Sequence, residues 1–392
     1  MTGIKGIITI SLRPLALLAC VLLLPGSPPV QAQIFDTSAP FAILMDASSG
    51  TVLFEKNADD LMAPASMAKL GLIDYVFTAI AEGRLSMSDE FVISENAWRR
   101  GGAASGGSTM FAELDSRVSL SDLLRGVIVQ SGNDASIAIA EGIAGSEIAF
   151  SDLLNDHVSN IGLTRSTFRN ATGLPDPDQR VTARDLAILT RHIVRNFPDL
   201  YTIFAEPDFT WNNIKQRNRN PLLGAGIGAD GLKTGYTEES GYGLAASAIS
   251  NDQRLIVIVN GLKNSRERAG EARKLLEWGF RSFRQFTIFE DGETIAEASV
   301  YGGEKGRVAL RAEGPLHVLV ARTNRDPLKA RAVYRGPIEA PIEAGLRVGV
   351  LKVWQGDRLI QETPLFAAES VGEGKLHQRA LDALGELLLG WL

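Results

Sequence analysis

Three short segments, Ser66-Met67-Ala68-Lys69, Ser131-Gly132-Asn133 and Lys233-Thr234-Gly235, stand in this order along a chain of 392 residues. The first supplies a hydroxyl nucleophile and an amine. The other two add a second hydroxyl, an amide and a second amine. Together they equip a serine acyl-transfer site that needs no histidine triad. Each segment is a weak signal by itself, whereas the ordered set is a strong one.

Ser66 and Lys69 form the first candidate pair. The sequence predicts a helix that begins at Ala63, and Lys69 then lies three residues after Ser66 on the same face, within reach of the hydroxyl. A lysine accepts a proton only when neutral, so burial or a nearby cation must lower its pKa, and Lys233 is the obvious cation. An isolated Ser-x-x-Lys is more simply a helix-capping serine followed by a solvated lysine.

The other two segments supply the remaining polar groups. Ser131-Gly132-Asn133 follows an apolar helical run, where a tight turn ends the helix, so that Ser131 can relay a proton and the Asn133 amide can hold a substrate carbonyl. Lys233-Thr234-Gly235 is predicted at a strand edge, where a glycine lets a substrate backbone approach and the two polar side chains bind a carboxylate. Either segment alone would be an ordinary turn.

The pattern of apolar residues predicts an α+β fold for the first two thirds of the chain. Because strand patterns come early and late, with helices between them, we expect one sheet that is closed by both ends of the domain's sequence. A β-hairpin is expected at 41–54, strands at 231–235, 243–249 and 254–262, and helices at 63–80, 120–130, 135–143, 147–161, 182–196 and 267–283.

The character of the sequence changes from Arg284 onward. Short alternating segments, separated by Gly, Pro and Asp, predict a separate small β-sandwich of roughly 90 residues. The expected organisation is therefore an export signal at 1–32, a catalytic domain at 33–283, the β-sandwich at 284–372 and a terminal helix at 373–392.

The first 32 residues are typical of a secretory signal. Two basic residues precede an apolar run at 15–24, Pro25-Gly26 interrupts it, and Val30-Gln31-Ala32 fits cleavage after Ala32. A retained membrane helix would need about 20 apolar residues, roughly twice this run. Lipid attachment at Cys20 is a further alternative, but Cys20 lies inside the apolar run and not at its end.

Residues 375–392 predict an amphipathic helix at the end of the chain. Leucines and Trp391 recur at helical spacing, while the charged residues lie mostly on other faces. The segment is too short and too polar to span a bilayer, so we expect it to lie in the membrane surface with its indole at the interface. Packing of this helix on the protein core is the alternative.

Composition narrows the range of partners. The chain carries 40 Lys and Arg against 46 Asp and Glu, a formal charge of −6, and loss of Lys5 and Arg13 with the signal would leave −8. This balance argues against nucleic acid, which requires clustered basic residues. The single cysteine would leave with the signal as well, so we expect no disulfide, no metal ion and no cofactor.

With these segments in place, the chain resembles the low-molecular-mass penicillin-binding proteins, D-alanyl-D-alanine carboxypeptidases that trim bacterial peptidoglycan. The resemblance runs from Phe41 to Leu392 and includes the motifs at 173–176, 182–187 and 275–280. It implies a penicillin-binding, β-lactamase-like transpeptidase domain, a small all-β domain and a terminal amphipathic helix. It also implies an exported enzyme, held peripherally on the periplasmic face of the inner membrane.

The same resemblance assigns roles to the candidate residues. The expected partners are peptidoglycan stem peptides ending in D-Ala-D-Ala and, as covalent inhibitors, β-lactam antibiotics. The first tetrahedral intermediate would be held by the backbone N–H groups of Ser66 and Tyr236. In the implied mechanism Ser66 attacks the carbonyl of the penultimate D-Ala, Lys69 takes its proton, Ser131 and Asn133 line the cleft, and Lys233, Thr234 and Gly235 bind substrate.

The resemblance bears on two further positions. Arg268 stands where the family places an arginine for the terminal carboxylate of the substrate, and Arg266, two residues earlier, is the alternative. Tyr236 follows Lys-Thr-Gly where many members carry histidine. The exchange leaves the backbone N–H in place, so it affects the expected substrate preference and not the oxyanion donor.

Two other functions compete with the carboxypeptidase hypothesis. A β-lactamase would share the three motifs but usually adds a loop glutamate that positions the deacylating water, and the sequence has no glutamate between Ile148 and Asp185. A non-catalytic peptidoglycan-binding scaffold would keep the fold alone, but all the catalytic side chains are present.

Overall fold

A computed structural model describes residues 8–11 and 35–375. Within it the chain divides into two compact units, one spanning Ile34–Arg281 and the other containing the residues from Ser282 onward. The expected membrane-surface helix lies outside the described residues, apart from its first positions up to Lys375, and so does most of the expected signal at 1–32. Both remain predictions.

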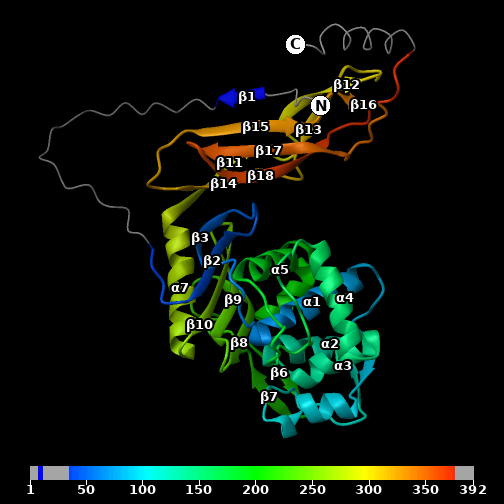
Figure 1. Ribbon diagram of the computed structural model, residues 1–392, viewed down its shortest axis with the longest axis vertical. Coiled ribbons are helices and arrows are strands. Elements are labelled where there is room, and N and C mark those ends of the chain that lie inside the picture. Colours follow the sequence, from blue (N-terminus) through cyan, green and yellow to red (C-terminus); the bar gives the residue numbers. More distant parts are fainter. Residues whose placement is uncertain (1–7, 12–34, 376–392) are drawn as a thin grey trace, which may run out of the picture. The chain divides into compact units, whose positions relative to one another are not determined.

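A five-stranded sheet forms the centre of the larger unit (Figure 1). Its strand order is β3-β2-β10-β9-β8, and all neighbouring pairs are antiparallel. The pairing of β2 with β10 brings the two ends of the unit together and confirms the predicted sheet. The strands are β2 (Phe41–Asp46), β3 (Val52–Lys56), β8 (Ala229–Thr237), β9 (Gly241–Ser250) and β10 (Gln253–Leu262).

Helices cover both faces of this sheet. On one face α7 (Ser265–Ser282) packs so closely that a Cβ at Gly279 would lie 2.7 Å from both Leu44 and Leu255. On the other face α5 (Ala183–Asn196) packs over the central strands. This double cover explains why β9 and β10 are nearly continuous runs of buried residues. The remaining helices are α1 (Lys69–Ala81), α2 (Leu120–Arg125), α3 (Asn133–Ala144), α4 (Glu147–Asn160) and α6 (Pro198–Tyr201).

A buried carboxylate joins three of these helices. Asp74 of α1 is fully buried, and its two oxygens contact His157 Nε2 of α4 at 2.6 Å and His192 Nδ1 of α5 at 2.7 Å. Helix α1 follows directly on the candidate nucleophile, so this contact fixes the element that positions Ser66 and Lys69.

Two predicted helices differ from the structure in a way that matters for the site. The first does not begin at Ala63: a 3₁₀ turn, η1 (Ala65–Ala68), precedes α1 and contains Ser66. The helix predicted at 120–130 is α-helical only to Arg125 and then widens into the π-helical turn η4 (Gly126–Gln130), which ends at Ser131. Hydrophobic periodicity cannot separate these helix types over one turn.

Short elements complete the larger unit. They comprise the small sheets β4 (Glu90–Val92) with β5 (Arg117–Ser119) and β6 (Asp208–Trp211) with β7 (Ile214–Arg217), and the turns η2 (Ala97–Gly101), η3 (Ala103–Ser105) and η5 (Thr202–Ala205).

The second unit is all-β, as predicted. A seven-stranded sheet of order β1-β15-β17-β18-β13-β12-β16 and a two-stranded sheet of β11 with β14 share one apolar core. Its edge strand β1 (Ile8–Ser11) belongs to the segment expected to be removed as a signal, and it pairs antiparallel with β15. The other strands are β11 (Phe283–Phe289), β12 (Ala296–Tyr301), β13 (Arg307–Arg311), β14 (Leu316–Ala321), β15 (Leu328–Tyr334), β16 (Ile338–Glu339), β17 (Arg347–Gln355) and β18 (Arg358–Ala367).

Across residues 8–11 and 35–375, none of the helices combines the length and the apolar character that crossing a bilayer requires.

Candidate active site

The 3₁₀ turn η1 places the Ser66 hydroxyl beside the Lys69 amine. In a 3₁₀ helix the side chains of residues i and i+3 eclipse each other, and Lys69 Nζ lies 3.1 Å from Ser66 Oγ. The turn begins at Ala65, whose φ of +47° is in the left-handed region that alanine rarely adopts. Strained backbone of this kind is frequent at functional sites.

Lys69 is completely buried and held from three sides. Besides Ser66 Oγ, its Nζ donates to Asn133 Oδ1 at 2.8 Å and to the carbonyl oxygen of Thr172. Burial is the main cause that lowers the pKa of Lys69 to about 7, and the charge of Arg219 lowers it further. Near neutral pH a substantial fraction of Lys69 is therefore the neutral amine that a proton acceptor must be.

Ser131 and Lys233 form a second hydroxyl and amine pair. Ser131 ends η4 in the left-handed conformation, with φ of +66°, and its Oγ accepts a 2.8 Å hydrogen bond from Lys233 Nζ. Lys233 also donates to the Thr234 carbonyl at 3.2 Å. Burial holds the pKa of Lys233 well below its usual range, and the charge of Lys69 adds to the effect. Protonation of Lys69 therefore disfavours protonation of Lys233.

Strand β8 carries Lys233-Thr234-Gly235-Tyr236 along one edge of the sheet. Among the described strands β8 pairs only with β9, so its other edge can accept an extended peptide. A Cβ at Gly235 would lie 2.9 Å from the Pro64 carbonyl, which shows how closely this edge approaches the turn with the nucleophile. Thr234 is buried, whereas half of the Tyr236 side chain is exposed.

The structure distinguishes the two candidate arginines on α7. Arg268 is partly buried, and its guanidinium lies over the Tyr242 ring, 5.6 Å from the centroid. Its Nε is buried and makes no hydrogen bond to any described residue. Arg266 is exposed. The ring of Tyr236 contacts that of Tyr242 in a tilted arrangement with centroids 4.2 Å apart, so Tyr242 connects the exposed ring of Tyr236 to the guanidinium of Arg268.

Arg219 is part of the site although no sequence motif indicated it. Its Nη1 donates to Ser108 Oγ at 2.6 Å, and its charge contributes to the lowered pKa values of Lys69, Lys233 and Arg268. Arg219, Arg268 and a protonated amine at Lys69 or Lys233 therefore create a positive region that favours an anionic ligand.

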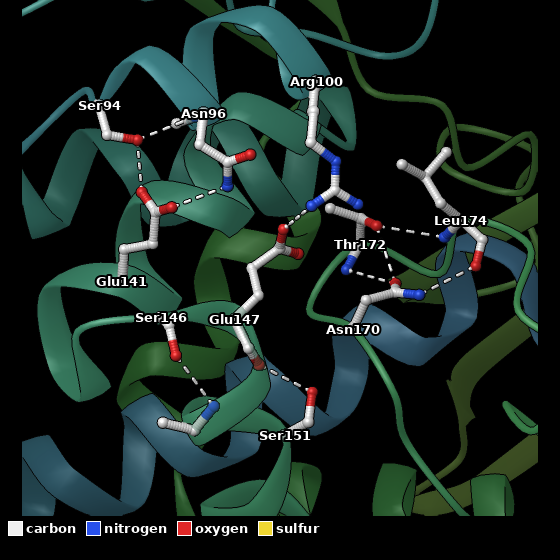
Figure 2. A network of polar contacts seen from close by, with 12 residues as sticks. Ser94, Asn96, Arg100, Glu141, Ser146, Glu147, Ser151, Asn170, Thr172 and Leu174 are labelled. Atoms are coloured by element: carbon white, nitrogen blue, oxygen red, sulfur yellow. Dashed lines mark hydrogen bonds and ion pairs between the residues drawn. The ribbon is translucent and has the colours of Figure 1, made fainter.

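The loop that contacts Lys69 was also missed as a functional element. Asn170 organises it: its Oδ1 accepts from the Thr172 N–H at 3.2 Å, and its Nδ2 donates to the Leu174 carbonyl at 3.1 Å (Figure 2). The same Oδ1 also accepts from the Gly173 N–H at 2.8 Å. Gly173 has φ of +79°, and a Cβ there would lie 1.9 Å from the Ala65 carbonyl. The resemblance to the family at 173–176 was the sequence signal available for this loop. It could not identify the Thr172 carbonyl as the acceptor, because a backbone carbonyl has no sequence signature.

The fold thus brings all three motifs to one place. Hydrogen bonds connect Ser66, Lys69 and Asn133 in one group and Ser131 and Lys233 in another. No group of three His, Cys, Asp or Glu side chains in the part of the chain that the structure describes is arranged to hold a metal ion. Chemically, the arrangement can support serine acyl transfer with a lysine as base.

Comparison with known protein families agrees with a serine acyl-transfer enzyme. Residues 28–264 match the D-alanyl-D-alanine carboxypeptidase family, peptidase S11, and residues 283–373 match the C-terminal domain of penicillin-binding protein 5. The chain belongs to the D-alanyl-D-alanine carboxypeptidase family.

Individual relatives are similar over most of their length. The chain is 40% identical to the D-alanyl-D-alanine carboxypeptidase DacC of Escherichia coli K12, over 87% of this chain and 86% of that protein. It is 39% identical to penicillin-binding protein 5 of Haemophilus influenzae, whose crystal structure superposes with a TM-score of 0.76 over 89% of this chain and all of that one. A Listeria monocytogenes penicillin-binding protein D2 with bound ampicillin is 28% identical over 62% of this chain and 98% of that one, with a TM-score of 0.54.

Proposed function

We propose that the chain is a serine-type D-Ala-D-Ala carboxypeptidase that removes the terminal D-alanine from peptidoglycan pentapeptide stems. The observation that carries the proposal is the hydrogen bond between buried Lys69 and Ser66. Relatives at 34–40% identity over most of the chain are D-alanyl-D-alanine carboxypeptidases, which supports the same activity.

In the proposed acylation step, Ser66 Oγ attacks the carbonyl carbon of the penultimate D-Ala and its proton passes to neutral Lys69. The backbone N–H groups of Ser66 and Tyr236 stabilise the developing oxyanion. When the C–N bond breaks, the amine of the leaving D-alanine takes up a proton through Ser131, which Lys233 orients. Water then hydrolyses the ester, which releases the shortened stem and regenerates Ser66.

The positive region is suited to the free carboxylate at the end of the substrate. Lys233 and Thr234 bind the substrate carboxylate from strand β8, and Arg268 binds it from α7. Asn133 Oδ1 already accepts from Lys69, so its Nδ2 amide is the group available to a substrate carbonyl. Because Nε of the partly buried Arg268 is itself buried and has no hydrogen-bond partner among the described residues, an incoming carboxylate compensates a cost that the free site carries.

β-Lactams are the second ligand class of this site. Two structures of one relative, penicillin-binding protein D2 of Listeria monocytogenes, in ampicillin-bound and cefotaxime-bound forms, support binding of such compounds at this site. The sequence has no glutamate between Ile148 and Asp185, a stretch that includes the loop beside Lys69, and the contact of this loop with Lys69 is through the Thr172 carbonyl. Without a base that activates water, the penicilloyl ester should be long-lived, unlike that of a β-lactamase.

The activity is tested by incubating the purified protein with a peptide ending in D-Ala-D-Ala and measuring released D-alanine. Ser66→Ala should abolish both release and covalent labelling by a fluorescent penicillin. Unimpaired release by this variant would overturn the proposal, and absence of labelling in the wild type would favour a non-catalytic scaffold. Rapid turnover of penicillin would favour a β-lactamase.

We further propose export of the chain, cleavage after Ala32 and peripheral attachment of residues 375–392 to the periplasmic face of the inner membrane. The apolar run at 15–24 and the amphipathic pattern with Trp391 support these proposals. Deletion of 375–392 should move the protein from the membrane fraction to the soluble fraction. An unchanged distribution would assign the segment to the core or to an oligomer interface.

A further inference from the structure

Glu147 is a buried carboxyl group close to the site that no motif includes. It is the first residue of α4 and its side chain is 7% exposed. One oxygen, Oε1, accepts from Arg100 Nη1 at 2.6 Å, while Oε2 is buried and has no hydrogen-bond partner among the described residues. A half-satisfied buried carboxyl is costly, which suggests a function for its retention.

The position of Glu147 relates it to Lys69. Figure 2 shows its carboxyl group beside the Arg100 guanidinium. The backbone N–H of Ala171, in the loop that carries Asn170 and Thr172, also faces this carboxyl group. Ala171 directly precedes Thr172, whose carbonyl accepts from Lys69 Nζ, so Glu147 faces the segment of the loop that positions this amine. In the part of the chain that the structure describes, no hydrogen bond joins Glu147 to Lys69, so any effect of Glu147 on this amine passes through its charge or through the loop.

The electrostatic coupling agrees with this arrangement. Burial raises the pKa of Glu147 above its usual range, and the Arg100 charge opposes the rise. The negative charge of Glu147 in turn raises the pKa of Lys69, against the larger lowering effect of burial. Asp134 has the same effect on Lys69, but its carboxylate accepts from the Thr109 hydroxyl and from three backbone N–H groups and is thereby fixed in place.

The groups that face Glu147 come from several elements. Arg100 comes from η2, Asn96 precedes that turn, and the Ala171 N–H belongs to the loop. The remaining charged neighbour is Glu141 of α3, whose oxygens accept from the Ser94 hydroxyl and the Asn96 amide (Figure 2). Arg100 is therefore the one cation among these groups, and its side chain is half exposed.

We infer that Glu147, paired with Arg100, is a positioning residue that sets the pH range in which Lys69 serves as the base of the reaction. The inference rests on the proposed function and extends it to a regulatory charge outside the substrate cleft. Loss of the negative charge makes the neutral amine available at lower pH, so the acylation reaction should work better in mildly acidic solution.

The test is the rate of Ser66 acylation by a fluorescent penicillin, measured from pH 5 to pH 9 for the wild type and for Glu147→Gln. Glutamine keeps the volume and one acceptor oxygen. We expect the acidic limb of the profile to move down by roughly 0.5–1 pH unit, so that acylation at pH 6 is about two- to fivefold faster while the alkaline plateau stays within about twofold.

Two matched variants separate charge from structure. Glu147→Asp keeps the charge and weakens the Arg100 contact, so its midpoint should remain that of the wild type. Glu141→Gln removes a carboxylate from the same network whose charge is not among the causes of the Lys69 shift, and it should not move the midpoint.

The inference is overturned by an unchanged midpoint in Glu147→Gln, by the same shift in Glu147→Asp, or by a uniform loss of rate at every pH. If Glu147→Gln does not fold, the aspartate variant still decides, because a shifted midpoint with the charge retained contradicts the inference. These outcomes differ from failure of the proposed function, in which the wild type itself is not labelled or Ser66→Ala still is.

Discussion

Lys233 Nζ and Ser131 Oγ lie 2.8 Å apart, although 102 positions separate the two residues in the sequence. The contact connects the edge strand β8 to the turn that ends η4, and it places the second amine opposite Lys69. Both amines are buried, and the pKa of each is lowered. The reactivity of the site therefore depends on which of the two amines, Lys69 or Lys233, is protonated.

The acylation rate should rise with pH through about 7. Lys69 is active when neutral, and a base whose folded-state pKa is about 7 is mostly protonated, and thus inactive, below that value. At pH 6 the rate should be about a tenth of its alkaline plateau. Stopped-flow acylation by a penicillin between pH 5 and 9 measures the profile. Lys69→Met should leave a rate about a thousandfold below the wild-type alkaline plateau that no longer rises with pH, and a residual rise through pH 7 in that variant would assign the titration to another group.

Ser131→Ala should lower kcat for D-alanine release about a hundredfold or more. The substitution removes the hydroxyl that receives the Lys233 hydrogen bond and relays a proton to the leaving amine. Ser136→Ala is the matched control, because Ser136 is also buried but donates only to the Gly132 carbonyl. Equal losses in the two variants would show that the effect of Ser131 is structural.

Arg268→Ala should lower kcat/KM for a D-Ala-D-Ala peptide roughly 10- to 100-fold. This is the range expected for loss of a charge-assisted hydrogen bond to the substrate carboxylate. Arg266→Ala, on an exposed position of the same helix, should have less than a twofold effect. The assignment to Arg268 fails if the two variants exchange these results.

Gly173→Ala should abolish most acylation and destabilise the protein more than a positive φ alone explains. The new Cβ would lie 1.9 Å from the Ala65 carbonyl, so the loop must move away from the nucleophile turn. Gly145→Ala has nearly the same φ, +78° against +79°, and nothing within 4 Å of the added Cβ. The control should therefore lose only about 1–2 kcal/mol of unfolding free energy, a decrease in Tm of about 2–8 °C.

Thermal unfolding and penicillin labelling of the two variants separate the effect of backbone strain at a positive φ from the effect of the clash with the Ala65 carbonyl. Equal decreases in Tm, with full labelling of both, would show that the approach of Gly173 to Ala65 has no importance for the site.

Much of the fold could be predicted because its pattern is strong. Helices at 147–161 and 182–196 agree with α4 and α5 within a residue or two, since Ser146 and Thr182 cap them in the structure. The hairpin and the late strands are apolar runs bounded by turn residues, and they form one sheet as expected. The boundary between the units was expected after residue 283 and lies after Arg281.

The parts of the site that could not be predicted are those made by backbone or by isolated side chains. The Thr172 acceptor is a carbonyl, which every residue has, and Arg219 has no neighbouring motif that distinguishes it from other arginines. The 3₁₀ turn at Ser66 depends on Ala65 adopting a positive φ, which the packing of Gly173 and Gly235 around it favours and the local sequence does not encode.

The contact between Gly173 and the Ala65 carbonyl also bears on antibiotic resistance. Rapid hydrolysis of a penicilloyl ester requires a water molecule and a base that activates it on this side of Ser66. Here the backbone of Gly173 lies directly against the Ala65 carbonyl, so any change that opens this space must move one of the two backbone segments. Evolution of this chain into a penicillin-degrading enzyme would therefore involve a change in the path of the loop.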